Sequence, residues 1–217
     1  MSFRVVDLSL PYRRGMSYVK IEPEALVEET GVNLTLLSLS VHAGTHLDAP
    51  IHWLRGGRTV DHLDLEKCVG PALVVDLTHK PPDSLISVED MGAYAGRIGP
   101  GSRLILRTDW DAHAWQPDYR TAFPRLSLEM ARWLADRNIW LLGIDMPSVA
   151  SLKEGDRQEL ADVHRALLAA EIVIVESMAN LRDLRGDAVF IVASPLSIEG
   201  SDGSPVRALG IEGLASS

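Results

Sequence analysis

The sequence predicts a mixed α/β fold in which strands predominate over a few helices. Short runs of apolar and β-branched residues recur along the whole chain, whereas only three segments carry the spacing or capping signals of a helix. The chain has 217 residues, of which 46% are apolar. Since domains have about 100–200 residues, we expect a single domain over residues 1–217 with a sizeable core.

The first half of the chain contributes four predicted strands. The segment from Arg4 to Leu10 alternates in polarity and stops at Pro11, as a short strand does. In Asn33–His42 (NLTLLSLSVH), β-type alternation is mixed with a buried run, and the strand is expected to deliver His42 at its end. The other elements predicted here are buried strands over Pro71–Leu77 and Arg103–Arg107 and, between them, a short helix over Glu89–Arg97 with Ser87 as its N-cap.

Helices and strands alternate in the second half. A helix is predicted from Leu128 to about Arg137 because Ser127 is a suitable N-cap. Apolar residues at helical spacing predict a second helix over Gln158–Ala170. The remaining elements are buried strands over Ile139–Ile144, Ile172–Glu176 and Ala188–Ala193, and a turn-rich loop over Ser197–Ser204.

Charge and composition exclude several classes of protein. Lys and Arg number 21 against 30 Asp and Glu, a formal net charge of −9, and the basic residues are scattered, so we expect no nucleic-acid partner. We see neither a run of roughly 18 apolar residues, which a membrane span requires, nor a basic start followed by the apolar stretch of a secretion signal. The single cysteine, Cys68, excludes an internal disulfide. We therefore expect a cytoplasmic protein that acts on a small molecule.

Three of the seven histidines fall in one stretch, His42-Ala-Gly-Thr-His46-Leu-Asp48-Ala-Pro-Ile-His52. The glycine and the proline disfavour a helix, so we expect a loop in which His46 and Asp48, two apart in extended chain, project to the same side. Two imidazoles and a carboxylate are the ligand set of a catalytic zinc, manganese or iron site that keeps open positions. The stretch therefore predicts a divalent metal bound by His42, His46 and Asp48.

His52 lies beyond these three residues, after a proline, and is available as a proton carrier. Its unperturbed pKa of about 6.5 suits it to accept a proton from the attacking water. Two downstream residues are ambiguous from the sequence: Glu176 fits a salt-bridged strand end as well as a metal ligand, and His164 fits an ordinary helix position better than a ligand. The other histidines, expected on the surface, are His62, His79 and His113.

Motifs along nearly the whole chain resemble the cyclase family of metal-dependent hydrolases, which includes the bacterial kynurenine formamidases. Besides the histidine stretch, they are Gly143-Ile-Asp145-Met-Pro147-Ser148-Val149, His164 followed by Glu176, Ser194-Pro195-Leu196, and Gly203-Ser-Pro205-Val206-Arg207-Ala208. The resemblance implies a swivelling β/β/α fold with a mixed sheet, assembled as homodimers or homotetramers. It also implies that His42, His46 and Asp48 bind metal, that His52 is the acid/base, and that His164 and Glu176 complete a second site in two-zinc members.

The resemblance favours an aryl formamide as substrate, N-formylkynurenine above all, with zinc as the first choice of metal. Relatives that open the lactam ring of isatin look similar around the histidine stretch and use one manganese, so a lactam or lactone hydrolase is the alternative. The chain departs from the formamidases in the Tyr12–Val19 loop, which helps to form their pocket, and after Ser148. Aromatic residues available to line a pocket are Tyr18, Trp53, Trp110 and Trp115.

Two hypotheses from other classes stay open. His46 and Asp48 with the distant His164 have the two-His-one-carboxylate form of a non-haem iron oxygenase. A non-catalytic protein that keeps a metal only to order a loop is the other hypothesis. The presence of His52 argues against it, because a structural site needs no spare base.

Overall fold

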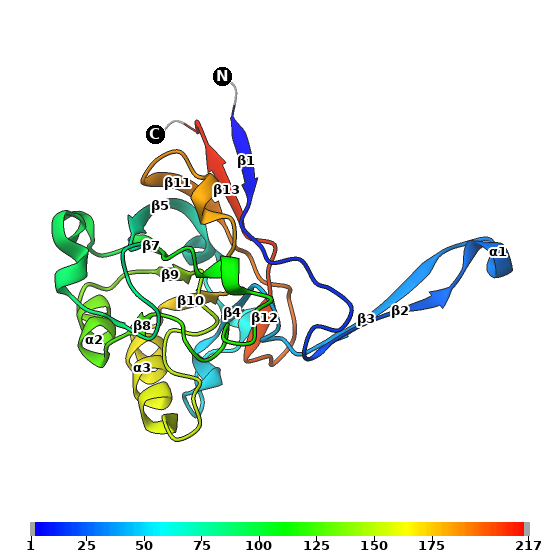
Figure 1. Cartoon of the computed structure of the whole chain (residues 1–217), viewed down its shortest axis with the longest axis horizontal. Helices are drawn as coiled ribbons and strands as arrows, with labels where there is room; N and C mark the ends of the chain where they lie inside the picture. The colour runs from blue at the N-terminus through cyan, green and yellow to red at the C-terminus, as the bar shows by residue number, and fades with distance from the viewer. Residues whose placement is uncertain (1–2, 215–217) are drawn as a thin grey trace.

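A nine-stranded mixed sheet runs through the centre of the computed structural model, which describes residues 3–214 (Figure 1). Its order is β1-β13-β11-β5-β7-β9-β10-β4-β12. The four central strands β5, β7, β9 and β10 are parallel, and the strands on both sides are antiparallel. The bounds are β1 Arg4–Asp7, β4 His46–Asp48, β5 Val69–Asp76, β7 Arg103–Arg107, β9 Leu141–Ile144, β10 Val173–Glu176, β11 Ala188–Val192, β12 Gly203–Pro205 and β13 Leu209–Glu212.

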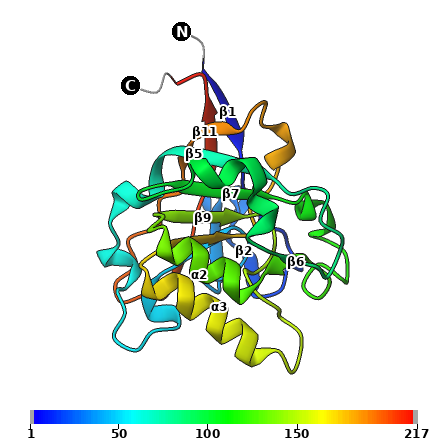
Figure 2. The same ribbon diagram turned by 90° about the vertical axis from the view of Figure 1, so that its left-hand side faces the viewer.

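Two helices, α2 (Leu128–Asp136) and α3 (Arg157–Ala169), lie side by side over one face of the sheet (Figure 2). Their apolar sides join one hydrophobic cluster with the sheet, and a second cluster contains residues of β4, β5, β10 and β11. Short 3₁₀ helices occupy the connections: Pro50–His52, Val60–His62, Leu65–Cys68, Glu89–Arg97, Trp110–His113 and Leu181–Asp183. Within residues 3–214, no helix is long and apolar enough to cross a bilayer.

The prediction of a mixed α/β fold with few helices is confirmed, and most predicted elements occur within two or three residues of their expected bounds. Ser127 caps α2 as expected, because its hydroxyl accepts a hydrogen bond from the backbone of Met130. The predicted cap at Ser87 is wrong. The 3₁₀ helix begins after Val88 without a side-chain cap, and the backbone N–H of Ser87 instead donates to the carboxylate of Asp90.

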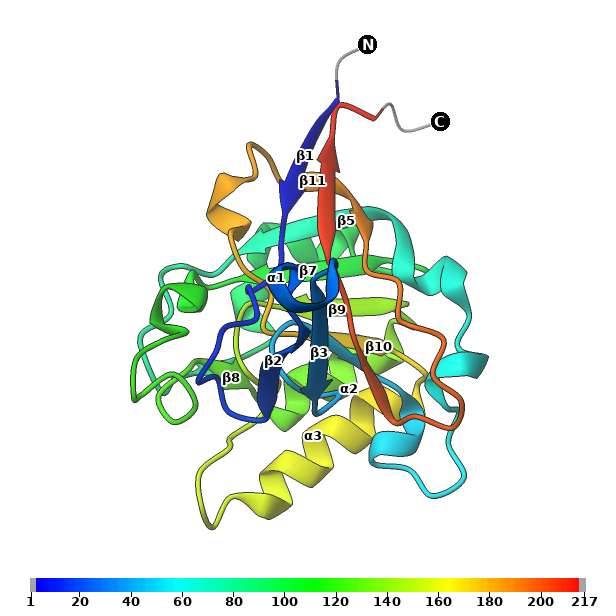
Figure 3. The ribbon, with the colours of Figure 1, turned by 90° about the vertical axis from the view of Figure 1, so that its right-hand side faces the viewer.

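An arm made of β2 (Val19–Ala25), the one-turn helix α1 (Val27–Thr30) and β3 (Leu34–Leu39) projects away from the sheet (Figures 1 and 3). Within residues 3–214, β2 and β3 pair only with each other. The strand expected over Asn33–His42 therefore exists, but it is not buried, and it ends at Leu39, before His42. A leucine-rich strand is buried only when a second layer covers it, and the sequence pattern does not reveal that layer. A further two-stranded sheet joins β6 (Leu85–Ile86) and β8 (Arg125–Leu126).

Candidate metal centre

The turn that leads into β4 is held in place by Thr45. This buried hydroxyl donates to the backbone oxygen of Ser177 at 2.6 Å and accepts from the backbone of Leu10 at 2.8 Å. Gly44 has φ +63°, and a side chain there would meet the ring of Tyr12. The turn therefore needs a glycine, and its tight path brings His42 back beside β4.

Strand pairing explains why distant residues meet at β4. His46 and Asp48 lie on this short strand, not on the predicted loop, and as residues two apart they share one face. In the antiparallel pair β4–β10, Glu176 stands opposite His46, and directly paired residues point to the same face. His164 reaches the group from α3. The structure therefore brings together all five residues predicted as ligands.

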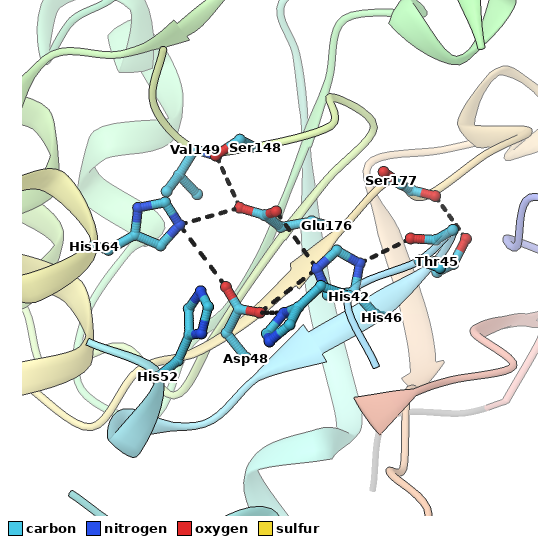
Figure 4. Close-up of polar contacts among 12 residues, drawn as sticks. His42, Thr45, His46, Asp48, His52, Ser148, Val149, His164, Glu176 and Ser177 are labelled. Atoms are coloured by element: carbon cyan, nitrogen blue, oxygen red, sulfur yellow. Dashed lines mark hydrogen bonds and ion pairs between the residues drawn. The ribbon is translucent and has the colours of Figure 1, made fainter. Parts of the chain in front are cut away.

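The donor atoms of these side chains converge (Figure 4). His46 Nε2 lies 3.5 Å from Asp48 Oδ1 and 3.6 Å from Glu176 Oε2. His164 Nε2 lies 3.5 Å from Glu176 Oε1 and 3.8 Å from Asp48 Oδ2. Metal–ligand bonds of about 2.0–2.2 Å in a tetrahedron separate neighbouring ligand atoms by roughly 3.3–3.6 Å. The donor atoms of His46, Asp48 and Glu176 therefore fit a divalent metal, and His164 faces the other oxygen of each carboxylate.

Burial makes this cluster strongly dependent on charge pairing. Asp48 and Glu176 are 1% and 5% exposed, and a buried carboxylate is costly without a cationic partner. Burial alone would raise the pKa of Asp48, but a hydrogen bond from His42 and the charges of His46, His42 and His164 hold it well below its usual range. Burial would lower the pKa of His42, and contacts with Asp48 and Asp202 instead raise it to about 9. The cluster therefore attracts a cation.

Hydrogen bonds fix the orientation of the candidate ligands. The Nδ1 atoms of His46 and His164 face the backbone oxygens of Gly44 (2.8 Å) and Leu160 (2.7 Å), which leaves Nε2 of each ring for a metal. Glu176 Oε1 accepts from the backbone of Val149 at 3.0 Å. Val149 belongs to the loop after β9, which Asp145 anchors by accepting three hydrogen bonds from Thr108 and Asp109. The motif from Gly143 to Val149 thus positions Glu176.

His52 and His42 share a carboxylate that the sequence did not indicate. Asp202 Oδ2 lies 3.0 Å from Nδ1 of His52 and 3.0 Å from Nε2 of His42. Asp202 reaches this position because β12 pairs with β4, with Gly203 opposite Asp48. A side chain at Gly203 would lie 2.6 Å from the ring of His42, so only glycine fits beside it.

Two adjoining cavities lie at the metal centre. The inner one, about 210 Å³, contains the five candidate ligands and His52 and is walled by Trp53, whose ring stacks on that of His164 with centroids 5.3 Å apart. The outer one, about 460 Å³, is lined by Tyr18 and Trp115. Trp110 is instead part of the core, where its indole N–H donates to the backbone of Tyr119.

The three histidines predicted at the surface have side chains 74%, 63% and 40% exposed: His62, His79 and His113.

Comparison with known proteins identifies the family. The Cyclase family model matches residues 6–151, more than half of the chain. A kynurenine formamidase of Bacillus cereus is 36% identical over 183 residues, 84% of this chain and 82% of that protein. Another, of Bacillus cytotoxicus, is 33% identical over 94% of this chain and 95% of its own length. The structure of isatin hydrolase A from Labrenzia aggregata bound to benzyl benzoate matches with a TM-score of 0.82 at 26% identity, covering 96% of this chain and 93% of that one. The chain belongs to the cyclase family.

Proposed function

We propose that this protein is a metal-dependent hydrolase of a small aryl amide, with N-formylkynurenine as the favoured substrate. The observation that carries the proposal is the convergence of His42, His46, Asp48, His164 and Glu176 beside His52. The choice of substrate is supported by the similarity to the kynurenine formamidases of Bacillus cereus and Bacillus cytotoxicus, which match most of the chain.

The proposed chemistry assigns the proton transfers to His52. A divalent metal in such a site acidifies water and polarises a carbonyl group. The Nδ1–H of His52 donates to Asp202, so Nε2 carries the lone pair that accepts a proton from the attacking water. His52 then returns this proton to the nitrogen of the departing aryl amine as the C–N bond breaks. Water and the formamide thereby yield the amine and formate.

Zinc is the metal we propose first, with manganese as the alternative. Imidazole nitrogen and carboxylate oxygen suit both ions. Asp48 and Glu176 each face His46 with one oxygen and His164 with the other, which supports a second ion held by His164 and Glu176. Elemental analysis of protein reconstituted with each metal in turn, with activity measured at each stoichiometry, tests the identity and number of ions.

A lactam hydrolase is the second candidate function, because isatin hydrolases match the fold with TM-scores of 0.80–0.83. The deciding experiment compares kcat/KM for N-formylkynurenine, isatin and an aryl lactone. We expect the formamide to be the best substrate, and more than tenfold faster turnover of a cyclic substrate would reject the formamidase assignment. Hydrolysis under anaerobic conditions with zinc or manganese excludes the iron oxygenase.

We also propose that residues 1–217 act as one cytoplasmic domain that assembles as a homodimer or homotetramer. Strands from both ends of the described chain pair in one sheet, which supports a single domain. The apolar face of the arm supports assembly. Directly paired residues on this face include Val19 with Leu39 and Ile21 with Leu37, and an isolated hairpin is marginally stable in water. A second copy of the chain would cover this face.

A further inference from the structure

The inner and outer cavities share two walls, His42 and Arg120. The outer cavity lies between the Gly15–Tyr18 loop and residues of the segment from Ala114 to Arg120. A substrate whose scissile carbonyl reaches the candidate ligands in the inner cavity, and whose body enters the outer one, passes Arg120. Arg120 therefore lies where it can contact the part of a substrate that is remote from the reacting carbonyl.

Arg120 is the one Lys or Arg side chain that lines either cavity within residues 3–214. Other arginines of the surrounding loops are already paired with carboxylates or stacked on a ring: Arg107 with Asp109, Arg125 with Glu159 and Asp83, Arg182 with Asp111, and Arg13 over Trp115. The side chain of Arg120 is exposed and makes no hydrogen bond or ion pair with the part of the chain that the structure describes. Its guanidinium group is available for a ligand.

We propose that Arg120 binds a carboxylate on the substrate, away from the C–N bond that is cleaved. Guanidinium binds carboxylate through two parallel hydrogen bonds, and these charge-assisted contacts are about twice as strong as neutral ones. The other ionisable side chains that line the inner cavity are histidines and the carboxylates Asp48 and Glu176, so Arg120 stabilises an anion without displacing a candidate ligand. This inference rests on the proposed function. It defines the substrate class as carboxylate-bearing aryl formamides, in preference to neutral amides and lactams.

Two matched substrates test the proposal: formanilide, which is neutral, and 4-formamidobenzoate, which adds one carboxylate at the end of the ring away from the C–N bond. We expect Arg120→Gln to lower kcat/KM for 4-formamidobenzoate roughly 10- to 100-fold, mainly through KM, as loss of a charge-assisted pair does. The value for formanilide should change less than about twofold, since no ion pair is lost. Arg13→Gln removes a nearby cation that lines neither cavity and should leave the ratio of the two substrates unchanged.

The outcomes separate the roles of Arg120. Equal losses of kcat on both substrates would mean that Arg120 acts at the reacting carbonyl, and no loss on either would mean that it contacts neither; both results overturn the proposal. If the wild type cleaves isatin but no formamide, the proposed function fails independently. Calorimetric binding of 4-aminobenzoate then decides the role of Arg120: weakened binding in Arg120→Gln supports carboxylate recognition, and unchanged binding overturns it.

Discussion

The candidate metal centre and the β2–β3 arm depart from the usual distribution of side chains in opposite directions. In the metal centre, ionisable groups are buried: Asp48, His46, His164 and Glu176 are at most 5% exposed. In the arm, apolar groups are exposed, since half of the 14 large hydrophobic side chains exposed in the described residues lie between Tyr18 and Leu37. Both arrangements carry a free-energy cost in an isolated chain.

The two regions differ in whether the groups that carry this cost find partners within the chain. The ionisable groups of the candidate centre are paired with one another at 2.8–3.8 Å, so they form a defined site within the chain, which we propose binds a cation. In the part of the chain that the structure describes, the arm has no comparable internal partner, because β2 and β3 pair only with each other. Substitutions in the centre should therefore affect metal binding and turnover, and substitutions in the arm should affect assembly.

The largest effect is expected from His46→Ala. This change removes an imidazole that lies within 3.6 Å of both Asp48 and Glu176. Loss of a residue that orients a ligand already weakens metal binding about 10- to 100-fold, so loss of the ligand should cost more and reduce turnover to background. Elemental analysis and activity assays measure both effects. His79→Ala, at an exposed histidine, is the control, and wild-type metal content in the His46 variant would contradict the assignment.

His52→Asn should keep the metal and lose turnover. The ring lies next to that of His42, with centroids 4.1 Å apart, but we assign it proton transfer. A positioned acid/base contributes about 100- to 10,000-fold, so kcat should fall by that factor at unchanged metal stoichiometry. His62→Asn, which alters an exposed histidine nearby in the chain, should have no effect. Turnover at the wild-type rate in the His52 variant would exclude the role.

A smaller effect is expected from Asp202→Asn. The amide keeps the shape of the side chain but loses the charge that orients both His42 and His52. We expect metal affinity to fall about 10- to 100-fold, as for other residues that orient a ligand, together with a lower kcat. Competition with a chelator measures the affinity. Asp61→Asn is the matched control, because the carboxylate of Asp61 accepts a hydrogen bond from Gly200, in the loop that also carries Asp202. If the two variants have the same metal affinity and kcat, Asp202 does not orient the candidate ligands.

Local patterns predicted the centre of the site better than its surroundings. His42, His46, Asp48 and His52 fall within eleven residues, so they could be grouped as one candidate site without knowledge of the fold. His164 and Glu176 were ambiguous from the residues alone and were predicted as ligands only through the family resemblance. Asp202 gave no signal, since its contact depends on the pairing of β12 with β4, strands more than 150 residues apart.

The same limit explains the arm and the cavities. Alternation predicted a strand near Leu34–Leu39, but its burial depends on which layer covers it, and the alternation does not determine this. Arg120 was not predicted as a site residue, because its position depends on how its loop packs beside the Gly15–Tyr18 loop. The fold class was predictable because the periodicity of each element is local.

The smallest effect on turnover is expected from the arm. Leu36 and Leu37 are neighbours on β3, about equally exposed at 52% and 48%, but they point to opposite faces. Leu37 stands opposite Ile21 on the apolar face, whereas Leu36 stands opposite Glu22. Leu37→Glu should therefore place a charge in the proposed interface and weaken the dimer by at least about tenfold, or 1.4 kcal/mol, while kcat changes less than about twofold. Light scattering across a micromolar dilution series measures this shift. Leu36→Glu is the control and should leave the oligomer intact. The apolar face of the arm is not the interface if both variants remain oligomeric, or if the wild type is monomeric at micromolar concentration.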